Sequence, residues 1–461
     1  MTAYVPISAR GMTGKTGASV LKSTGIYLGL VFVLVLAGCQ RDDPILPGIR
    51  EGIRDEQVNA AFVPNEEASD ENDLPLVLPK PIVNADWPQS IGTELTRVAH
   101  PALSKTPQLV WSVPIGAGDS RKSRITADPI VAQGRVFAMD AQSKVSAFTT
   151  AGAAVWSTDL VPENENASDA TGGGLAYGDD KVFVTSGFGL ITALDAATGA
   201  VVWQQNMRAT GSGSPTYLEG LVYAVSGDDV AWALDAKTGR IRWQLSATPD
   251  LSNVLGGPAP ALSQKYAVFA YGASEFQGAF RKGGLRLWDA QIAGQRPGFS
   301  SARIGDITGD PVIVGDRIFT GSHSGRTVAL NLANGERLWT AKDGPLNRVW
   351  PAGNSIFMIT DRNELVRINA ENGRRIWGKA LSFFKSKKPK RQARIIAHQG
   401  PIIAGGQLIV ASDDGFIHLY NPTTGTETGT VPLPGGASSN PIVAGGTLYV
   451  VTSNGKLLAF R

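Results

Sequence analysis

The sequence predicts an all-β protein, an eight-bladed β-propeller whose blades are four-stranded antiparallel sheets. Three observations lead to this fold. A phrase ending in tryptophan recurs along the chain, a second phrase precedes it in most copies, and the pair repeats about every forty residues, the length of one propeller blade. The composition agrees, since only 18% of the residues are charged and 54 of the 461 are glycine.

The first phrase describes a hairpin. An apolar strand runs into Asp or Asn, then into a Thr-Gly or Asn-Gly pair, and a second strand ends in tryptophan. The glycine falls where a tight turn needs a positive φ, which suits a residue without a Cβ atom. The tryptophan follows at a fixed offset and is expected to cover a crevice between neighbouring repeats. The copies are ALDAATGAVVW at 193–203, ALDAKTGRIRW at 233–243, ALNLANGERLW at 329–339, RINAENGRRIW at 367–377 and the shortened AFTTAGAAVW at 147–156.

The second phrase is another hairpin, with alternating apolar residues, a glycine-containing turn and a strand rich in β-branched and aromatic residues. Two hairpins per repeat make the four antiparallel strands of one blade. The copies are PIVAQGRVFAMD from 129, SPTYLEGLVYAVSGDD from 214, DPVIVGDRIFTGSHSG from 310, GPIIAGGQLIVASDDG from 400 and NPIVAGGTLYVVTSNG from 440.

The outer strands give the number of blades, which is eight. The last repeat stops at GKLLAFR, one strand short, while PQLVWSVPI at 107–115 is an outer strand without a repeat of its own. We therefore expect the first strand to complete the last blade and close the ring. The markers are Trp111, Trp156, Trp203, Trp243, a divergent copy within 288–299, Trp339, Trp377, and the strand after Gly425 with Gly429 in the tryptophan position.

Residues 1–38 have the pattern of a lipoprotein signal peptide. Basic residues precede an apolar run at 26–36, which is shorter than a membrane span and has the position of a signal-peptide core. The run ends in LAGC, which resembles the lipobox of bacterial lipoproteins, whose cysteine is acylated and becomes the new N-terminus. Cys39 is the only cysteine, so it has no disulfide partner in the chain. We predict lipidation of Cys39; the alternative is a plain signal peptide or anchor with an incidental cysteine.

Residues 39–106 are predicted to form an acidic, proline-rich tether to a propeller over 107–461. They lack sustained apolar periodicity, although DWPQ at 86–89 can pack on the propeller. Cleavage after 1–38 removes three basic and no acidic residues, so the formal charge falls from +3 to 0, which disfavours nucleic-acid binding. Gln40 stands where an aspartate resembles an inner-membrane retention signal. The anchor is therefore expected in the outer membrane, facing the periplasm.

The sequence predicts no catalytic residue, no metal site, no cofactor and no small-molecule substrate. The histidines are scattered and lack metal-ligand spacing, and the paired aspartates lie at predicted turns, which their local hydrogen bonds favour. These residues are His100, His323, His398, His418, Asp179, Asp180, Asp228, Asp229, Asp413 and Asp414.

Quinoprotein oxidoreductases carry similar tryptophan-rich blades and are the enzymatic alternative; a ligand-sensing propeller is another. Such enzymes hold pyrroloquinoline quinone on a tryptophan floor, coordinate calcium with carboxylates and an amide, and commonly place a vicinal disulfide against the cofactor. A chain with one cysteine has no vicinal disulfide.

The segment 379–394 is an extended loop with seven basic residues and two phenylalanines. It is either a solvated loop or a contact to anionic headgroups or to an acidic partner surface.

The lipobox, the acidic tether and eight blades closed by an N-terminal strand together resemble the BamB-type lipoproteins of the outer-membrane β-barrel assembly machinery, a family with PQQ-like repeats. The resemblance implies a non-enzymatic scaffold that binds the periplasmic POTRA domains of the BamA subunit and assists insertion of outer-membrane proteins. It places the contact on loops between consecutive blades, which match 250–260 and 302–311 here. Thr308 stands at the family's second acidic position. The partner-binding residues that the resemblance implies are Leu251, Val254, Leu255, Arg303, Ile304 and Asp306.

Overall fold

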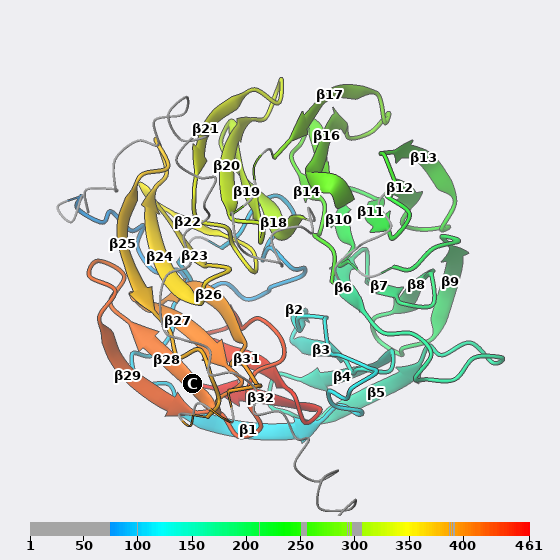
Figure 1. Cartoon of the computed structure of the whole chain (residues 1–461). Coiled ribbons are helices and arrows are strands. Elements are labelled where there is room, and N and C mark those ends of the chain that lie inside the picture. The colour runs from blue at the N-terminus through cyan, green and yellow to red at the C-terminus, as the bar shows by residue number, and fades with distance from the viewer. Residues whose placement is uncertain are drawn as a thin grey trace, which may run out of the picture. The chain divides into compact units, whose positions relative to one another are not determined.

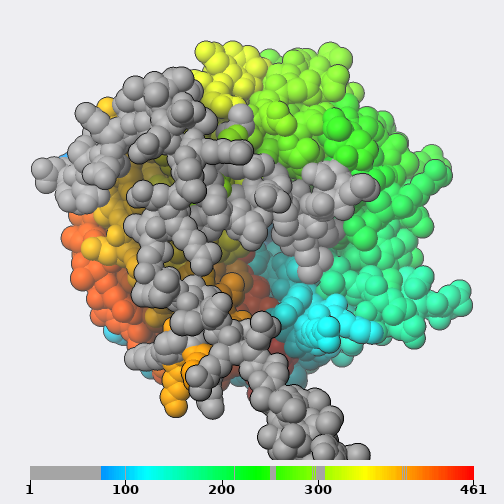
Figure 2. All heavy atoms as spheres, viewed as in Figure 1, coloured from blue at the N-terminus to red at the C-terminus, as the bar shows by residue number. Residues whose placement is uncertain are grey.

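The eight-bladed ring is observed. The computed structural model describes residues 74–461 except 99, 212, 250–255, 293, 295, 297–306, 387, 389 and 391. The chain divides into two units, Met1–Phe62 and Val63–Arg461, and every described residue belongs to the second. Within the described residues, eight four-stranded antiparallel sheets follow one another around a ring (Figure 1). The predicted all-β propeller is therefore confirmed, and the space-filling view shows the blades around the rim in chain order, from cyan to red (Figure 2).

Each blade runs from an inner strand near the ring axis to an outer strand at the rim. Blade 1 contains β2 (Ile130–Ala132), β3 (Arg135–Met139), β4 (Lys144–Thr149) and β5 (Ala154–Asp159). Blade 2 contains β6 (Gly173–Gly178), β7 (Lys181–Ser186), β8 (Leu190–Asp195) and β9 (Val201–Asn206). Blade 3 contains β10 (Thr216–Leu218), β11 (Leu221–Ser226), β12 (Val230–Asp235) and β13 (Ile241–Ser246). Blade 4 contains β14 (Ala261–Leu262), β15 (Tyr266–Ala270), the short 3-10 helix η1 (Gly272–Ser274), β16 (Glu275–Phe280) and β17 (Arg286–Gln291).

The second half of the ring repeats this order. Blade 5 contains β18 (Ile307–Val314), β19 (Arg317–Ser322), β20 (Arg326–Asn331) and β21 (Arg337–Ala341). Blade 6 contains β22 (Trp350–Ala352), β23 (Ser355–Ile359), β24 (Glu364–Asn369) and β25 (Arg375–Ala380). Blade 7 contains β26 (His398–Ala404), β27 (Gln407–Ser412), β28 (Phe416–Tyr420) and β29 (Glu427–Pro432). Blade 8 contains β30 (Ile442–Ala444), β31 (Thr447–Thr452), β32 (Lys456–Phe460) and β1 (Leu109–Pro114).

The first strand closes the ring, as predicted. β1 pairs antiparallel with β32, with Leu109 opposite Phe460 and Pro114 opposite Lys456. The Gln108 N–H extends this ladder by donating to the Arg461 carbonyl at 2.7 Å. Both ends of the propeller sequence thus share one sheet, which ties the last blade to the first.

The core lies between neighbouring blades. One cluster joins Phe137 of blade 1 with Leu175 and Val182 of blade 2. The two middle strands of a blade are therefore buried on both faces, whereas outer strands such as β9 alternate between exposed and partly buried residues. This explains why the middle strands read as continuous apolar runs in the sequence.

The tryptophans couple each blade to the next, which confirms their predicted place between repeats. Trp203 of β9 donates from Nε1 to the Ala236 carbonyl at 3.0 Å, and its ring lies against Gly239 in the same turn. The same pairing of a ring with the next turn glycine recurs around the ring, and the divergent repeat supplies Trp288. The remaining pairs are Trp111 with Gly152, Trp156 with Gly199, Trp243 with Gly284, Trp288 with Gly335, Trp339 with Gly373 and Trp377 with Gly425.

Gly239→Ala is expected to lower the free energy of unfolding by about 2 kcal/mol or more, because the new methyl overpacks the blade contact. The added Cβ would lie 2.6 Å from the Trp203 ring, at a φ of +72°. Gly134→Ala is a matched control, since Gly134 has the same φ of +72° and nothing within 4 Å of its Cβ position. Urea unfolding of both variants separates the ring contact from backbone strain; equal losses would show that the tryptophan contact contributes nothing.

The N-terminal segment formed by 74–98 and 100–106, here called the strap, crosses one face of the ring (Figure 1, blue). This differs from the expectation of a tether for these residues, although DWPQ does pack on the propeller. The physical reason is that the strap contacts all eight blades, either through backbone hydrogen bonds or through side chains. Its contacts are Trp87 with Val131, Pro88 with Tyr177, Gln89 with Tyr217, Leu95 with the cluster around Leu262, Thr96 with Ile313, Trp87 with Trp350, Pro101 with Gly405, and Asn84 with Val443.

The opposite face carries the connections between blades. Because every blade has an even number of strands, each connection from an outer strand to the next inner strand emerges on the same side. The turn between the first two strands of each blade lies on the strap side, where the Gln133 N–H donates to Asp86 Oδ1 at 3.0 Å. The strap and the blade connections therefore occupy different faces, called here the strap face and the connection face.

Candidate functional site

A polar funnel lies on the ring axis at the connection face. Its volume is about 200 Å³, and Ser90 of the strap lies at its base. Small-molecule sites are usually about 300 Å³ or more, so the funnel is small for an organic ligand. Its other lining residues are Ile125, Thr126, Asp128, Gly173, Ser214, Gly256, Gly257, Thr308, Asp310, Asn347, Arg348, Gln399, Ser438, Ser439 and Asn440.

Arg348, in the connection before β22, is the centre of a buried ion cluster in this funnel. Its guanidinium donates to the Asp128 carboxylate and to the Ser90 carbonyl, and its Nε lies 3.6 Å from Asp310 Oδ2. Both carboxylates accept further hydrogen bonds: Ser90 Oγ donates to Asp310 Oδ2 at 2.8 Å, and the Asn440 N–H donates to Asp128 Oδ1 at 2.8 Å. The cluster thus joins the strap to blades 1, 5, 6 and 8.

Burial governs the protonation of this cluster. The loss of water lowers the pKa of Arg348 to about 10, so the side chain keeps its charge at neutral pH. Burial also raises the pKa of Asp310, while hydrogen bonds from Ala259 and Ser90 and the charge of Arg97 oppose the rise. Since Arg348 faces both carboxylates, the arrangement is suited to holding elements together.

Arg97 of the strap is a second buried arginine. Its guanidinium carbon lies 4.2 Å from the centroid of the Trp350 ring, and Trp350 stacks on Trp87 at 6.2 Å. No described residue accepts a hydrogen bond from its guanidinium nitrogens. Burial and the like charge of Arg348 lower the pKa of Arg97 well below its ordinary value, and the cation–π contact offsets part of the cost of burial.

The carboxylates of the cluster were missed by the sequence reasoning, although they carry a signal. Asp128 and Asp310 each precede the proline of the second repeated phrase, as Ser214 and Asn440 do in other blades, and all four line the funnel. A polar residue before that proline therefore marks a funnel position. Arg348 has no such signal, because it stands in the connection before blade 6, whose sequence does not match the repeated phrases of the other blades.

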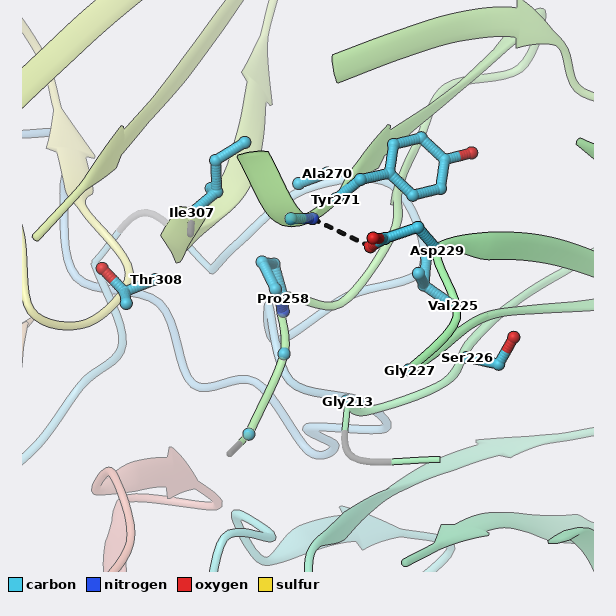
Figure 3. A pocket seen from close by; sticks show the side chains of 13 residues that line it. Gly213, Val225, Ser226, Gly227, Asp229, Pro258, Ala270, Tyr271, Ile307 and Thr308 are labelled. Carbon is cyan, nitrogen blue, oxygen red and sulfur yellow. Dashed lines mark hydrogen bonds between the residues drawn. The ribbon is translucent and has the colours of Figure 1, made fainter. Parts of the chain in front are cut away.

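A smaller pocket lies beside the funnel, between blades 3 and 4 (Figure 3). Its volume is about 50 Å³, which suits one or two water molecules. Asp229 Oδ1 accepts a hydrogen bond from the Gly272 N–H at 2.9 Å, so this aspartate links two blades. Asp229 has a φ of +58° in the turn after β11, as expected of a turn residue.

The funnel does not fit the cofactor of a quinoprotein. Its described lining contains no tryptophan to form a floor for a planar quinone. Its two carboxylates, Asp128 and Asp310, both face Arg348, which competes with a calcium ion for them. The charged residues of the funnel therefore pair with one another and hold the strap and the blades together.

The histidines are not all scattered as predicted, because His398 and His418 of blade 7 line one cavity of about 300 Å³. His100 accepts a hydrogen bond from the Gly406 N–H at 2.8 Å on the strap face, and His398 Nδ1 lies 2.6 Å from Ser412 Oγ. His418 lies between Asp414 and Glu427, at 3.0 and 2.7 Å. Burial lowers the pKa of His418, but these two carboxylates outweigh it and the net shift is upward.

Among the described residues, no group of three His, Cys, Asp or Glu side chains is arranged to hold a metal ion. Within the same part of the chain, no helix has the length and apolar character needed to cross a membrane.

The predicted partner-binding residues and the predicted lipidation site lie outside the described residues. These are Leu251, Val254, Leu255, Arg303, Ile304, Asp306 and Cys39. The described ends of the two predicted loops nevertheless meet, because the Ala259 N–H donates to Asp310 Oδ1 at 3.0 Å. Gly256, Gly257 and Thr308, from the same segments, all line the funnel.

Comparisons with known proteins agree on one family. Residues 141–379 and 380–461 match the family described as outer membrane protein assembly factor BamB. A protein of that name from Shewanella oneidensis is 26% identical over 362 residues, covering 76% of this chain and 88% of that protein. Its namesake from Escherichia coli strain K12 is 27% identical over 355 residues, with coverage of 76% and 88%.

Solved structures show the same fold. BamB from Moraxella catarrhalis has a TM-score of 0.64 at 16% identity and covers 77% of this chain and 99% of that chain. A quinohemoprotein alcohol dehydrogenase from Comamonas testosteroni has a TM-score of 0.62 at 15% identity, with coverage of 85% and 83%. At these identities both likenesses concern the propeller fold alone. Since the family match spans well over half of its residues, the chain belongs to the family of the outer membrane protein assembly factor BamB.

Proposed function

We propose that this chain is a non-enzymatic scaffold of the outer-membrane β-barrel assembly machinery, assisting the insertion of outer-membrane proteins. Its family membership supports this role, because relatives that cover about three quarters of the chain bear the assembly-factor name. The funnel also supports this role, because its charged side chains form contacts that join the strap to the blades. The chain is anchored in the outer membrane through acylated Cys39, with its propeller in the periplasm.

The partner in this proposal is the BamA-type barrel subunit, bound through its POTRA domains by the loops at 250–260 and 302–311. The contact between Ala259 and Asp310 carries the proposal, because it fixes the described ends of both loops at one place on the connection face. A rigid ring that presents two adjacent loops offers one continuous binding surface. Apolar side chains from the first loop and charged side chains from the second then supply its energetic centre.

Leu255→Ala and Asp306→Ala are each expected to weaken binding to purified POTRA domains by about 2 kcal/mol, roughly thirtyfold, as truncation of a central interface residue does. Titration calorimetry measures the affinity. Val202→Ala is a matched control, because Val202 is a half-exposed apolar residue of β9 at the rim. Unchanged affinity in both loop variants would place the interface elsewhere. A large fall in melting temperature would show that these residues pack inside the propeller.

Membrane attachment has its own test. A fatty-acid probe supplied to growing cells is expected to label the wild-type chain and to leave Cys39→Ser unlabelled, since acylation requires the thiol. Equal labelling of both chains would contradict lipidation at Cys39.

The enzymatic alternative is tested by reconstitution with pyrroloquinoline quinone and calcium, followed by dye reduction with alcohols and sugars. We expect no saturable turnover, because the described funnel lacks a tryptophan floor. Saturable activity would overturn the scaffold proposal.

A further inference from the structure

Two short segments of the connection between blades 6 and 7 lie antiparallel to each other. They are residues 383–386 and 394–396, joined by one isolated antiparallel bridge, and Lys388 and Lys390 lie between them in the sequence. Phe384 pairs with Ile395, while the Lys385 N–H donates to the Arg394 carbonyl at 3.0 Å. We call these described residues the basic ribbon.

The base of the basic ribbon is held firmly against the propeller. Ile396 is buried, and its carbonyl accepts a hydrogen bond from Asn363 Nδ2 at 3.2 Å. The Lys385 ammonium lies 2.6 Å from Asp413 Oδ2, and His398 Nε2 lies 2.9 Å from the Ser382 carbonyl. The base of the basic ribbon is thus fixed on the propeller, which lowers the entropic cost of a contact made by the neighbouring Phe384 and Ile395.

The basic ribbon exposes three large apolar side chains. Residues directly opposite each other in an antiparallel pair share a face, so Phe384 and Ile395 lie together. Phe384 is 37% exposed and Ile395 is 57% exposed. Phe383 is 41% exposed, with its ring 4.7 Å from that of Phe384. Three large apolar side chains are therefore gathered in contact with solvent.

The charge of this segment has one sign. Residues 379–394 contain seven basic residues and no acidic one. Lys388, Lys390 and Arg394 are exposed, and among the described residues none of the three forms an ion pair. The exposed apolar cluster is thus flanked by cations that have no acidic partner within the described propeller.

We propose that the basic ribbon contacts an anionic lipid surface. Phe383, Phe384 and Ile395 enter the headgroup region, and the flanking cations face lipid phosphates. Aromatic residues beside lysines are the composition of interfacial membrane elements. An acidic protein partner is disfavoured because five of the seven cations are lysine, a residue depleted in protein interfaces.

This inference rests on the proposed attachment to the outer membrane, which holds the propeller near lipid. The ribbon adds a second membrane contact to the acyl anchor, and two such signals bind much more stably than one. The partner loops lie in the connections before blades 4 and 5, whereas the ribbon lies in the connection before blade 7. The two proposed contacts therefore use separate parts of the connection face, and either can fail without the other.

The test uses chain 39–461 with Cys39→Ser, so that no acyl group contributes, and cosedimentation with vesicles. We expect binding to vesicles of equal parts phosphatidylcholine and phosphatidylglycerol, weakened by salt, and little binding to phosphatidylcholine alone. The triple variant K388E/K390E/R394E is expected to bind at least about a hundredfold less tightly, since each lost cation costs about fivefold near an anionic surface and each new carboxylate adds repulsion. F384S/I395S is expected to lose binding with its charge unchanged.

A matched control reverses three exposed cations elsewhere, in R208E/K237E/R240E, and is expected to bind vesicles nearly as the parent does. Equal losses in the control and the ribbon variant would overturn the proposal, because net charge alone would then explain binding. So would a ribbon variant that binds vesicles normally but loses affinity for POTRA domains, which would assign the ribbon to an acidic protein partner. Retention of POTRA affinity with loss of vesicle binding supports the lipid contact alone.

Discussion

Replacing Arg348 with methionine is expected to lower the free energy of unfolding by about 3–5 kcal/mol, because it leaves buried carboxylates without their counter-charge. Asp128 and Asp310 both face this guanidinium, and the Ser90 carbonyl loses its donor as well. Urea unfolding followed by tryptophan fluorescence measures the change, since the blade-coupling tryptophans report on the ring.

Arg242→Met is the matched control for this substitution. Arg242 pairs with Asp235 at 2.9 Å, but its side chain is 59% exposed, and exposed pairs contribute only about 0–1 kcal/mol. A second variant, Arg348→Met with Asp128→Asn, is expected to recover part of the loss because one uncompensated charge is removed. Similar stabilities of Arg348→Met and Arg242→Met would show that the buried cluster does not hold the ring together.

The loss in Arg348→Met is also expected to shrink as the pH falls. Burial already raises the pKa of Asp310, and removal of Arg348 raises it further. A carboxyl whose pKa is higher in the folded state than in the unfolded chain favours folding increasingly as the pH falls through the folded-state value. Unfolding curves between neutral and mildly acidic pH measure this trend; a loss that grows on acidification would contradict it.

The ring was predictable because the information that specifies it is local and repeated. A turn such as the one at Gly239 needs a positive φ and lacks space for a methyl group beside Trp203, so both residues recur at a fixed spacing. Closure of the ring followed from counting strands. The outer strand at 107–115 belongs to no repeat and the last blade lacks one strand, so the first strand completes the last blade. The divergent repeat was placed only within a range, and the structure identifies its marker as Trp288.

The funnel was not predictable in the same way, because its contacts join residues far apart in sequence. Ser90 meets Arg348 and Asp310 across more than two hundred positions, and no period relates them. The packing of the strap on the ring was not predictable for a related reason. Its residues contact eight different blades, so its apolar residues follow neither a strand nor a helix period. The predicted partner residues stand between repeats in the sequence, where the repeat itself carries no information on side-chain placement.

Trp87→Ala is expected to lower the free energy of unfolding by about 3–5 kcal/mol, the usual cost of deleting a fully buried tryptophan. Trp87 is 1% exposed, stacks on Trp350 and pairs through its backbone with Val131 in both directions. Its loss also removes support from Arg97, whose buried guanidinium lies on the other ring of this stack. The strap is therefore expected to loosen before the blades separate.

Two measurements distinguish a loosened strap from general damage. Limited proteolysis of Trp87→Ala is expected to cut within 74–106 faster than in the parent chain, with the blades cut at an unchanged rate. Val83→Ala is the matched control, because Val83 belongs to the same strap but is 74% exposed and should leave both stability and cleavage unchanged. Cleavage that begins in the blades would mean that Trp87 supports the ring directly. A Trp87→Ala chain as stable and resistant as Val83→Ala would mean that the strap lies on the propeller without stabilising it.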